Sequence, residues 1–300
     1  MTPAELFRRL AGLEGDPRTT ADIWRDMSSA PGFVDSRNCG FMDAVQSGWY
    51  QNDSDELFRG FPISADDSVL DVGCGAGGAT LFCARRGAHV VFIDAVAEKI
   101  EALRARLADT PARRAEGHVC ASLPLPVASE SMTRVIAMEV LEHVPDPAAF
   151  LAELQRVGEP GALYLLVVPD ELAEQMQQGL APEYYFREPN HIHVFGREQF
   201  VRMVAEAGLE VVQRDSYGFF WTFWMLLYWT QARSLGDALD GESHDVVQPP
   251  YPPLLNDWAK LWYQVIKLPE AAPMKQALDQ LLPKSQVIVA RKPRDGKATA

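Results

Sequence analysis

From residue 66 onward the chain alternates short apolar runs with helical patterns, and this alternation limits its fold more than any other feature. The runs end in glycine or polar residues, which is the pattern of buried strands. The expected strands cover residues 68–72, 89–93, 117–120, 134–138, 163–168, 209–213 and 286–290. Helices are expected at 79–86, at 97–107, from 147 and at 197–207, and the one at 97–107 is amphipathic. Such alternation predicts an α/β fold, in which helices cover both faces of a parallel sheet.

Charge and cysteine content exclude several classes of protein. The 300 residues hold 28 Lys+Arg and 41 Asp+Glu, a formal net charge of −13, which repels nucleic acid and anionic lipid. No apolar run approaches the roughly 20 residues that span a bilayer, so no integral membrane segment is expected. The four cysteines form no C-x-x-C pair and the first ten residues contain no apolar signal stretch. A cytoplasmic protein with reduced thiols is therefore expected.

The first expected strand runs into a glycine-rich turn, DVGCGAGG, at residues 71–78. Glycine allows a tight turn and lets a ligand approach the backbone at a helix N-terminus. The second strand ends at Asp94, whose carboxylate is placed to accept from two ribose hydroxyls. Gly73, Gly75 and Gly78 satisfy the dinucleotide fingerprint, and the same turn also satisfies the shorter G-x-G-x-G. The alternatives are structural roles, in which Asp94 caps a helix and Asp71 stabilises the turn.

Two further features separate these interpretations. Asp71 lies two positions before the first glycine, and the fourth strand leads into MEVLEHVPDP at residues 138–147. Together with VLDVGCGAGG at residues 69–78, this segment resembles the class I S-adenosylmethionine-dependent methyltransferases. The likeness covers residues 66–215 and is greatest to the ubiquinone-biosynthesis-type O-methyltransferases. It implies a seven-stranded Rossmann-like sheet that is mostly parallel, with an antiparallel last strand and helices on both faces.

The resemblance implies S-adenosylmethionine as the cofactor and assigns a set of binding residues. Asp71 would orient the amino group of the cofactor, and Asp94 would accept from its ribose hydroxyls. The third strand ends without the acidic residue that the family usually has, so the adenine amine would be held by backbone groups or the Ser122 hydroxyl. The full cofactor set is Asp71, Gly73, Cys74, Gly75, Asp94, Ala95, Ser122, Leu123 and Met138.

Polar residues that follow the fourth and fifth strands are the candidates for catalysis. Glu139, Glu142 and His143 could bind a divalent ion such as Mg²⁺, and the resembled enzymes associate this triplet with one. The alternative is that these residues cap a turn or face the substrate. His143 and His193 are the expected proton acceptors, because imidazole titrates near neutral pH. His191 is expected to be an ordinary loop histidine.

About 70 residues separate the sixth and seventh strands, which the family joins tightly. They open with YGFFWTFWMLLYW at residues 217–229, which is apolar all round. A helical aromatic cap over the active site is expected, with Trp224 facing the substrate; a homodimer interface and a monotopic membrane helix are the alternatives. The expected domains are a helical segment at 1–65 that closes over the site, a methyltransferase core at 66–216 plus 286–292, and the insertion at 217–285.

These observations together predict a methyltransferase that acts on a small-molecule acceptor. A hydroxyl oxygen is the acceptor that the resemblance favours. Gly78 keeps an NAD-dependent dehydrogenase open as an alternative. A non-catalytic cofactor-binding protein, which would use the aromatic insertion to bind a partner, is the second alternative.

Overall fold

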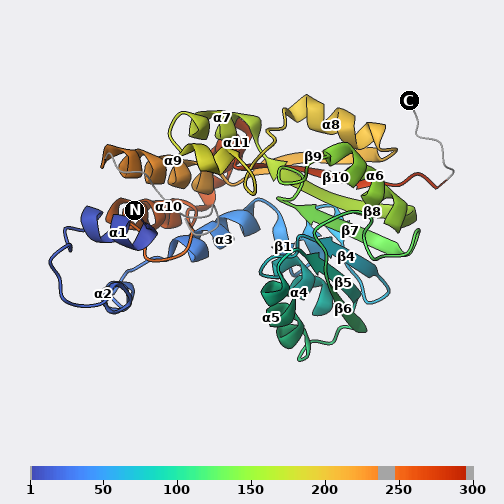
Figure 1. Ribbon diagram of the computed structural model, residues 1–300, viewed down its shortest axis with the longest axis horizontal. Helices are drawn as coiled ribbons and strands as arrows, with labels where there is room; N and C mark the ends of the chain where they lie inside the picture. Colours follow the sequence, from blue (N-terminus) through green and yellow to red (C-terminus); the bar gives the residue numbers. More distant parts are fainter. Residues whose placement is uncertain (1, 236–246, 295–300) are drawn as a thin grey trace. The chain divides into compact units, whose positions relative to one another are not determined.

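The computed structural model describes residues 2–235 and 247–294, which form two compact units. The helical unit takes Met1–Ser47, Glu171–Ile192 and Ser216–Lys284, and the sheet unit takes Gly48–Asp170, His193–Asp215 and Ser285–Ala300. Each unit is thus assembled from three separate parts of the chain (Figure 1).

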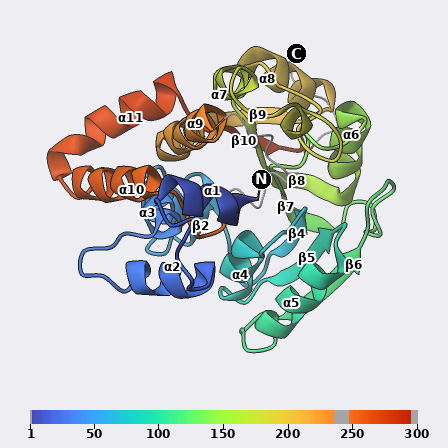
Figure 2. The same ribbon diagram turned by 60° about the vertical axis from the view of Figure 1, so that its left-hand side comes forward.

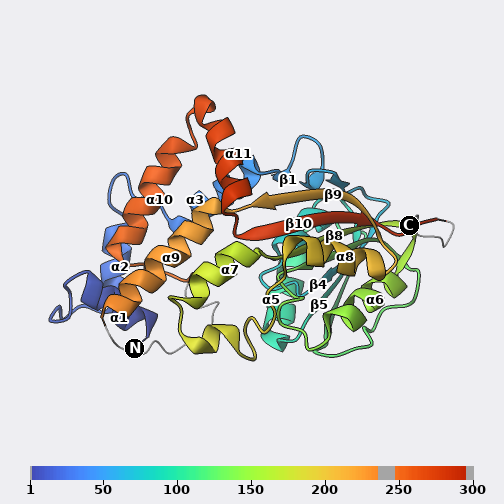
Figure 3. The same ribbon diagram turned by 90° about the horizontal axis from the view of Figure 1, so that it is seen from above.

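The sheet unit is built on seven strands in the order β6-β5-β4-β7-β8-β10-β9 (Figure 1), with β10 between β8 and β9 (Figure 3). Their bounds are β4 (Ser68–Val72), β5 (His89–Asp94), β6 (Arg114–Val119), β7 (Met132–Met138), β8 (Gly158–Pro169), β9 (Glu210–Tyr217) and β10 (Ser285–Arg291). The strands from β6 to β8 pair in parallel, and β10 pairs antiparallel with β8. The predicted mostly parallel sheet is therefore confirmed. Its strand order reverses at β4 and β7, which is where such sheets bind ligands.

Helices cover both faces of this sheet (Figure 2). They are α4 (Gly78–Ala84) and α5 (Ala97–Leu107) on one face, and α6 (Pro147–Val157) and α8 (Arg197–Glu206) on the other. Successive strand residues point to opposite faces, so Leu70 and Val72 join the core beneath α6 and α8. On the α5 face, a Cβ on Gly117 would lie 2.5 Å from Phe92 and 2.9 Å from Ile100. A glycine in β6 is thus required for α5 to pack closely.

Residues 49–62 differ from the expected helical segment. They form a three-stranded antiparallel sheet of β1 (Trp49–Gln51), β2 (Glu56–Phe58) and β3 (Phe61–Pro62), which belongs to the sheet unit. Trp49 is paired with Phe58 in register, and their ring centroids are 4.8 Å apart. Strands of two or three residues are too short for a period of two to show in the sequence. Trp49 is 1 % exposed, so it packs in the core.

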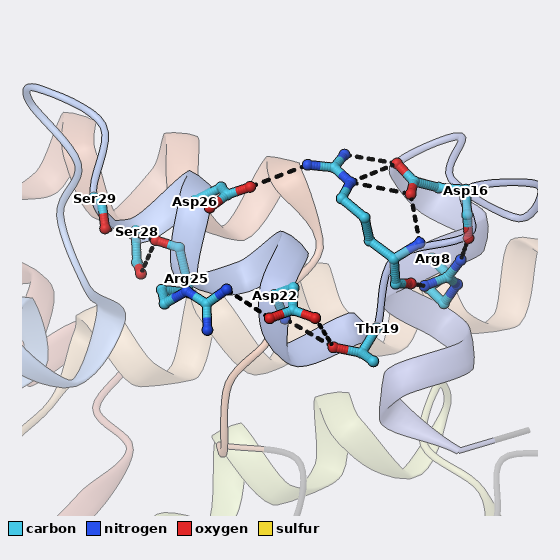
Figure 4. A network of polar contacts seen from close by, with 9 residues as sticks. Arg8, Asp16, Thr19, Asp22, Arg25, Asp26, Ser28 and Ser29 are labelled. Atoms are coloured by element: carbon cyan, nitrogen blue, oxygen red, sulfur yellow. Dashed lines mark hydrogen bonds and ion pairs between the residues drawn. The ribbon is translucent and has the colours of Figure 1, made fainter.

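The helical unit consists of seven α-helices and two short 3₁₀ helices in the described residues. They are α1 (Pro3–Leu10), α2 (Thr20–Ser28), α3 (Ser36–Gln46), α7 (Glu171–Gln178), η1 (Glu183–Phe186), α9 (Phe219–Ser234), α10 (Pro253–Val265), η3 (Pro269–Ala271) and α11 (Ala272–Leu281). Polar contacts hold the α1–α2 connection, where Asp16 and Asp26, both labelled in Figure 4, pair with Arg18 at 2.6 Å and 3.1 Å. Thr19 caps α2 by accepting from the backbone N–H of Asp22. None of the described helices has both the length and the apolar character needed to cross a membrane.

The aromatic run of the insertion forms α9, whose side chains pack within the helical unit. Trp224 is fully buried, stacks on Tyr228 at 5.6 Å, and donates from Nε1 to Ser36 Oγ at 3.0 Å. The expectation that Trp224 faces a substrate was therefore wrong, because an apolar ring with a satisfied N–H is used in the core of this unit. The insertion also shares its core with residues 1–47 and 171–192. Residues 236–246 of the predicted insertion lie outside the described residues.

Candidate active site

Acidic residues mark the carboxyl ends of the four central parallel strands. Asp94 ends β5, Asp71 lies one residue before the end of β4, Glu139 follows β7, and Asp170 follows β8. In a parallel sheet these ends meet at one edge, the edge at which open α/β sheets bind ligands. The accumulated negative charge suits a cationic ligand.

The glycine turn between β4 and α4 leaves room for a ligand at one of its glycines. Gly73, Gly75 and Gly77 have φ values of 70°, 50° and 77°, a region that glycine enters without strain. A Cβ on Gly73 would lie 2.4 Å from Val140 Cγ2, and one on Gly77 would lie 2.2 Å from Leu103 Cδ1. On Gly75, the nearest atom would be the carbonyl oxygen of Gly73 at 3.9 Å. The space beside Gly75 is therefore open for a ligand to contact the backbone.

Asp94 fastens this turn to the end of β5. Its Oδ2 accepts from the N–H of Gly75 at 2.9 Å, and its Oδ1 accepts from the N–H of Val96 at 3.0 Å. A carboxylate has about four lone-pair sites, so two of them remain for the adjacent hydroxyls of a ribose. Asp94 therefore ties the glycine turn to Val96, the residue at the N-cap of α5.

Asp71 is held by a residue that sequence reasoning did not single out. Thr80, in the first turn of α4, donates from Oγ1 to Asp71 Oδ2 at 2.5 Å, and both side chains are buried. Burial raises the pKa of Asp71 to about 6, opposed by the hydrogen bonds from Thr80 and assisted by the charge of Asp94. The only sequence signal for this pair was a hydroxyl in the first turn of the helix that follows the glycines.

Exposed apolar side chains in the segments that follow β5 and β6 could pack against the ring of a nucleobase. Val96 and Leu123 are 39 % and 40 % exposed, although both are apolar. Ala95 and Ser122 are also exposed, and Met138 is half-buried at the end of β7. Burial raises the pKa of Cys74 to about 12, so this residue remains a thiol that packs in the turn.

The segment after β7 brings together only part of the predicted metal triplet. Glu142 is fully buried, and its Oε1 lies 3.8 Å from His143 Nε2. Glu139 has a φ of 56° and accepts at Oε1 from Ser285 Oγ at 2.7 Å. Across residues 2–235 and 247–294, Glu139 belongs to no set of three side chains close enough to share an ion. Ser285 was not foreseen, because it lies 146 residues away along the chain.

His193 lies against the same segment. Its backbone N–H donates to the Glu142 carbonyl at 3.3 Å, and its Nε2 is 3.0 Å from the Val144 carbonyl oxygen. A carbonyl only accepts, so the neutral ring carries its proton on Nε2 and Nδ1 is the acceptor. His191 belongs to the helical unit, where its Nδ1 lies 2.8 Å from Oε2 of the buried Glu174.

Comparison with known proteins points to one family. A family model described as "Methyltransferase domain" matches residues 50–214, which is more than half of the chain. The ubiquinone biosynthesis O-methyltransferase of Hahella chejuensis is 40 % identical over 94 residues, covering 31 % of this chain and 40 % of that protein. Methyltransferase GfsG of Streptomyces halstedii is 29 % identical over 168 residues, covering 53 % and 59 %. The matched part thus spans 40 % and 59 % of the length of these two relatives.

The fold has a counterpart among solved structures. The crystal structure of geranyl diphosphate C-methyltransferase from Streptomyces coelicolor A3(2) matches with a TM-score of 0.50 and 17 % sequence identity. The match covers 93 % of this chain and 88 % of that one. At this identity the likeness concerns the fold.

Proposed function

Because this chain belongs to the methyltransferase-domain family, we propose that it transfers the methyl group of S-adenosylmethionine to a hydroxyl oxygen of a small molecule. The observation that carries the proposal is the joint geometry of Gly75 and Asp94. The open backbone surface at Gly75 and the carboxylate of Asp94 lie side by side, joined by a 2.9 Å hydrogen bond. This arrangement offers adjacent sites for the methionine and ribose parts of one ligand.

The remaining residues of the edge fit the other parts of this cofactor. Asp71 supplies a negative charge for the ammonium group, and Val96 and Leu123 supply exposed apolar surface for adenine. Ala95 and Ser122 follow β5 and β6, and Met138 is the last residue of β7, at the same edge. Cys74 contributes its backbone, because its side chain is buried.

The chemistry asks little of the protein beyond alignment and proton transfer. Bound S-adenosylmethionine supplies an activated methyl group, and the chain must orient the acceptor oxygen and exclude water. When a hydroxyl attacks, its proton must be taken up. We assign this role to Nδ1 of His193, whose tautomer is fixed by the Val144 carbonyl. His143, beside Glu142, is the second candidate for this proton.

The predicted Mg²⁺ site would require a rearrangement. Glu142 and His143 are adjacent, but Glu139 would have to leave Ser285 to join them. We therefore expect methyl transfer to persist in excess EDTA, with no gain on adding Mg²⁺. Activity that disappears in EDTA and returns with Mg²⁺ would instead assign Glu139, Glu142 and His143 as ligands.

The function is tested with S-adenosylmethionine that carries a tritiated methyl group. The full chain is incubated with matched acceptors that offer a phenolic hydroxyl, an amine or a thiol, and each product is identified by mass. We expect the label to appear on the phenol. The Asp94→Ala variant is the matched control, because it lacks the carboxylate that we propose binds the ribose of the cofactor. Label only on the amine or thiol would refute the oxygen assignment.

Calorimetry with S-adenosylhomocysteine and with NAD⁺ separates the alternatives. Binding of NAD⁺ alone would support a dehydrogenase. Binding of S-adenosylhomocysteine without transfer to any acceptor would support a non-catalytic protein. A homodimer through the insertion stays a prediction, which sedimentation of the full chain tests.

A further inference from the structure

Hydrogen bonds from Thr80 to Asp71, one of them from the threonine hydroxyl, bridge the two elements on either side of the glycine turn. Asp71 lies on β4, before the turn, and Thr80 lies on α4, after it. Thr80 Oγ1 is 2.5 Å from Asp71 Oδ2, and the two residues are 0 % and 4 % exposed, respectively. The carboxylate is therefore fixed from the far side of the turn by a hydroxyl that has no charge to neutralise it.

Among the residues that the structure describes, the groups found to interact with Asp71 carry no positive charge. Those that interact electrostatically with it are Asp94 on β5, Tyr50 on β1, Cys74 in the turn and Cys83 on α4. Burial and the Asp71 charge both raise the pKa of Tyr50, which reaches about 12, so this neighbour stays a phenol. Lys99 approaches Asp94 at 3.9 Å. Asp71 thus relies on Thr80 for the stabilisation of its charged form.

The same environment decides the charge state of Asp71 without a ligand. Burial raises the pKa of Asp71 to about 6, so the unliganded carboxyl takes up a proton as pH falls through this region. The arrival of a cation at this carboxylate reverses the balance, because an opposite charge within a few ångströms favours the ionised form.

We propose that Thr80 and Asp71 form a proton-linked receptor for the ammonium group of the cofactor, in which binding expels one proton from Asp71 to solvent and Thr80 sets the pH of this exchange. The step is balanced: the neutral carboxyl loses its proton, the carboxylate pairs with the ammonium, and no covalent bond to the ligand forms. The inference rests on the proposed cofactor. Thr80 acts through Asp71, so it is a positioning residue.

The proposal predicts how affinity changes with pH in the wild-type protein. With a pKa of about 6, the apparent affinity is flat above pH 7 and falls about tenfold from that plateau at pH 5. About half a proton is released on binding at pH 6, and almost none at pH 8. Removal of the Thr80 hydroxyl raises the pKa of unliganded Asp71, which moves the onset of the loss upward by about one to two pH units.

Titration calorimetry with S-adenosylhomocysteine, which keeps the ammonium group, provides the test. Wild type, Thr80→Val and Thr80→Ser are each titrated between pH 5.5 and 8.5, in two buffers of different ionisation enthalpy, so that proton release is measured directly. Valine matches the shape of threonine without the hydroxyl, and serine keeps the hydroxyl without the methyl group. Circular dichroism confirms that each variant is folded.

We expect the affinity gap between Thr80→Val and wild type to widen as pH falls, and Thr80→Ser to restore the wild-type curve. A gap of constant size at every pH would show a merely structural role and overturn the inference. Wild-type binding with no proton release and no pH dependence would also overturn it, independently of any variant, while leaving the proposed function intact. Failure of wild type to bind S-adenosylhomocysteine would refute the proposed function itself.

Discussion

Replacement of Asp43 by asparagine should remove a pH-dependent weakness from the helical unit. Asp43, on α3, accepts at Oδ1 from Trp262 Nε1 at 2.8 Å and lies 3.2 Å from Lys275 Nζ. Its Oδ2 is buried with no hydrogen-bond partner in the described part of the chain. Lys275 also binds Asp279 Oδ2 at 2.5 Å. Two buried carboxylates thus share one lysine, which leaves an excess negative charge when both are ionised.

The size of the effect follows from the pKa of Asp43. Burial is the largest cause of its rise from 3.8 to about 6; Lys275 opposes this rise and Asp279 adds to it. A pKa that is higher in the folded state favours the protonated form there. The contribution to stability is therefore complete below about pH 4 and is lost as pH rises through 6. The full loss is about 3 kcal/mol, and about half of it falls above pH 5.

Hydrogen exchange of peptides from α3 and α11 measures this loss in the helical unit alone. Protection, corrected for the intrinsic exchange rate, is compared between Asp43→Asn and wild type at pH 5 and pH 8. The protection of Asp43→Asn divided by that of wild type should be about tenfold larger at pH 8 than at pH 5. Asp257→Asn, at an exposed position of α10, is the matched control and should show no such shift. An Asp43→Asn ratio that is equal at both pH values would refute the reasoning.

Three further substitutions test the site and the packing. Asp94→Ala should weaken S-adenosylhomocysteine binding by about 1.5–3 kcal/mol in calorimetry, since hydrogen bonds to a charged group are lost; unchanged affinity would move the ribose contact elsewhere. His193→Gln should lower kcat by about 10²–10⁴-fold with near-normal cofactor affinity, and an unchanged kcat would exclude it as the base. Gly40→Ala should cost about 1–3 kcal/mol in chemical denaturation, because its Cβ would lie 2.3 Å from Trp221 Nε1; wild-type stability would contradict this packing.

Local patterns in the sequence were sufficient to predict most of the sheet unit. The helix expected at 97–107 is α5 with the same bounds, because its apolar stripe of Ile100, Leu103 and Leu107 repeats at helical spacing. Strand β4 likewise matches its expected range, since an apolar run stopped by glycines leaves few alternatives. The glycine turn and Asp94 were found in the same way. These features are all encoded within about ten neighbouring residues.

The features that sequence reasoning missed depend on contacts between distant residues. Ser285 donates a hydrogen bond to Glu139, which lies 146 positions away along the chain, and no local sequence pattern predicts such a pair. Trp224 was misread because a helix that is apolar all round does not reveal which side faces a ligand. Its full burial means that truncation to alanine would test stability, at about 3–5 kcal/mol, rather than substrate use.

The two ends of the insertion are tied to each other. The backbone N–H of Lys284 donates to the carbonyl of Tyr217 at 2.9 Å, and Asp279 Oδ1 accepts from the N–H groups of Gly218 and Phe219 at 3.1 and 3.0 Å. The end of β9 and the start of β10 therefore meet as the two arms of a hairpin whose turn has been enlarged. The register of β9 and β10 is therefore set where the insertion leaves the sheet, whereas its helices are held by the core that they share with residues 1–47 and 171–192.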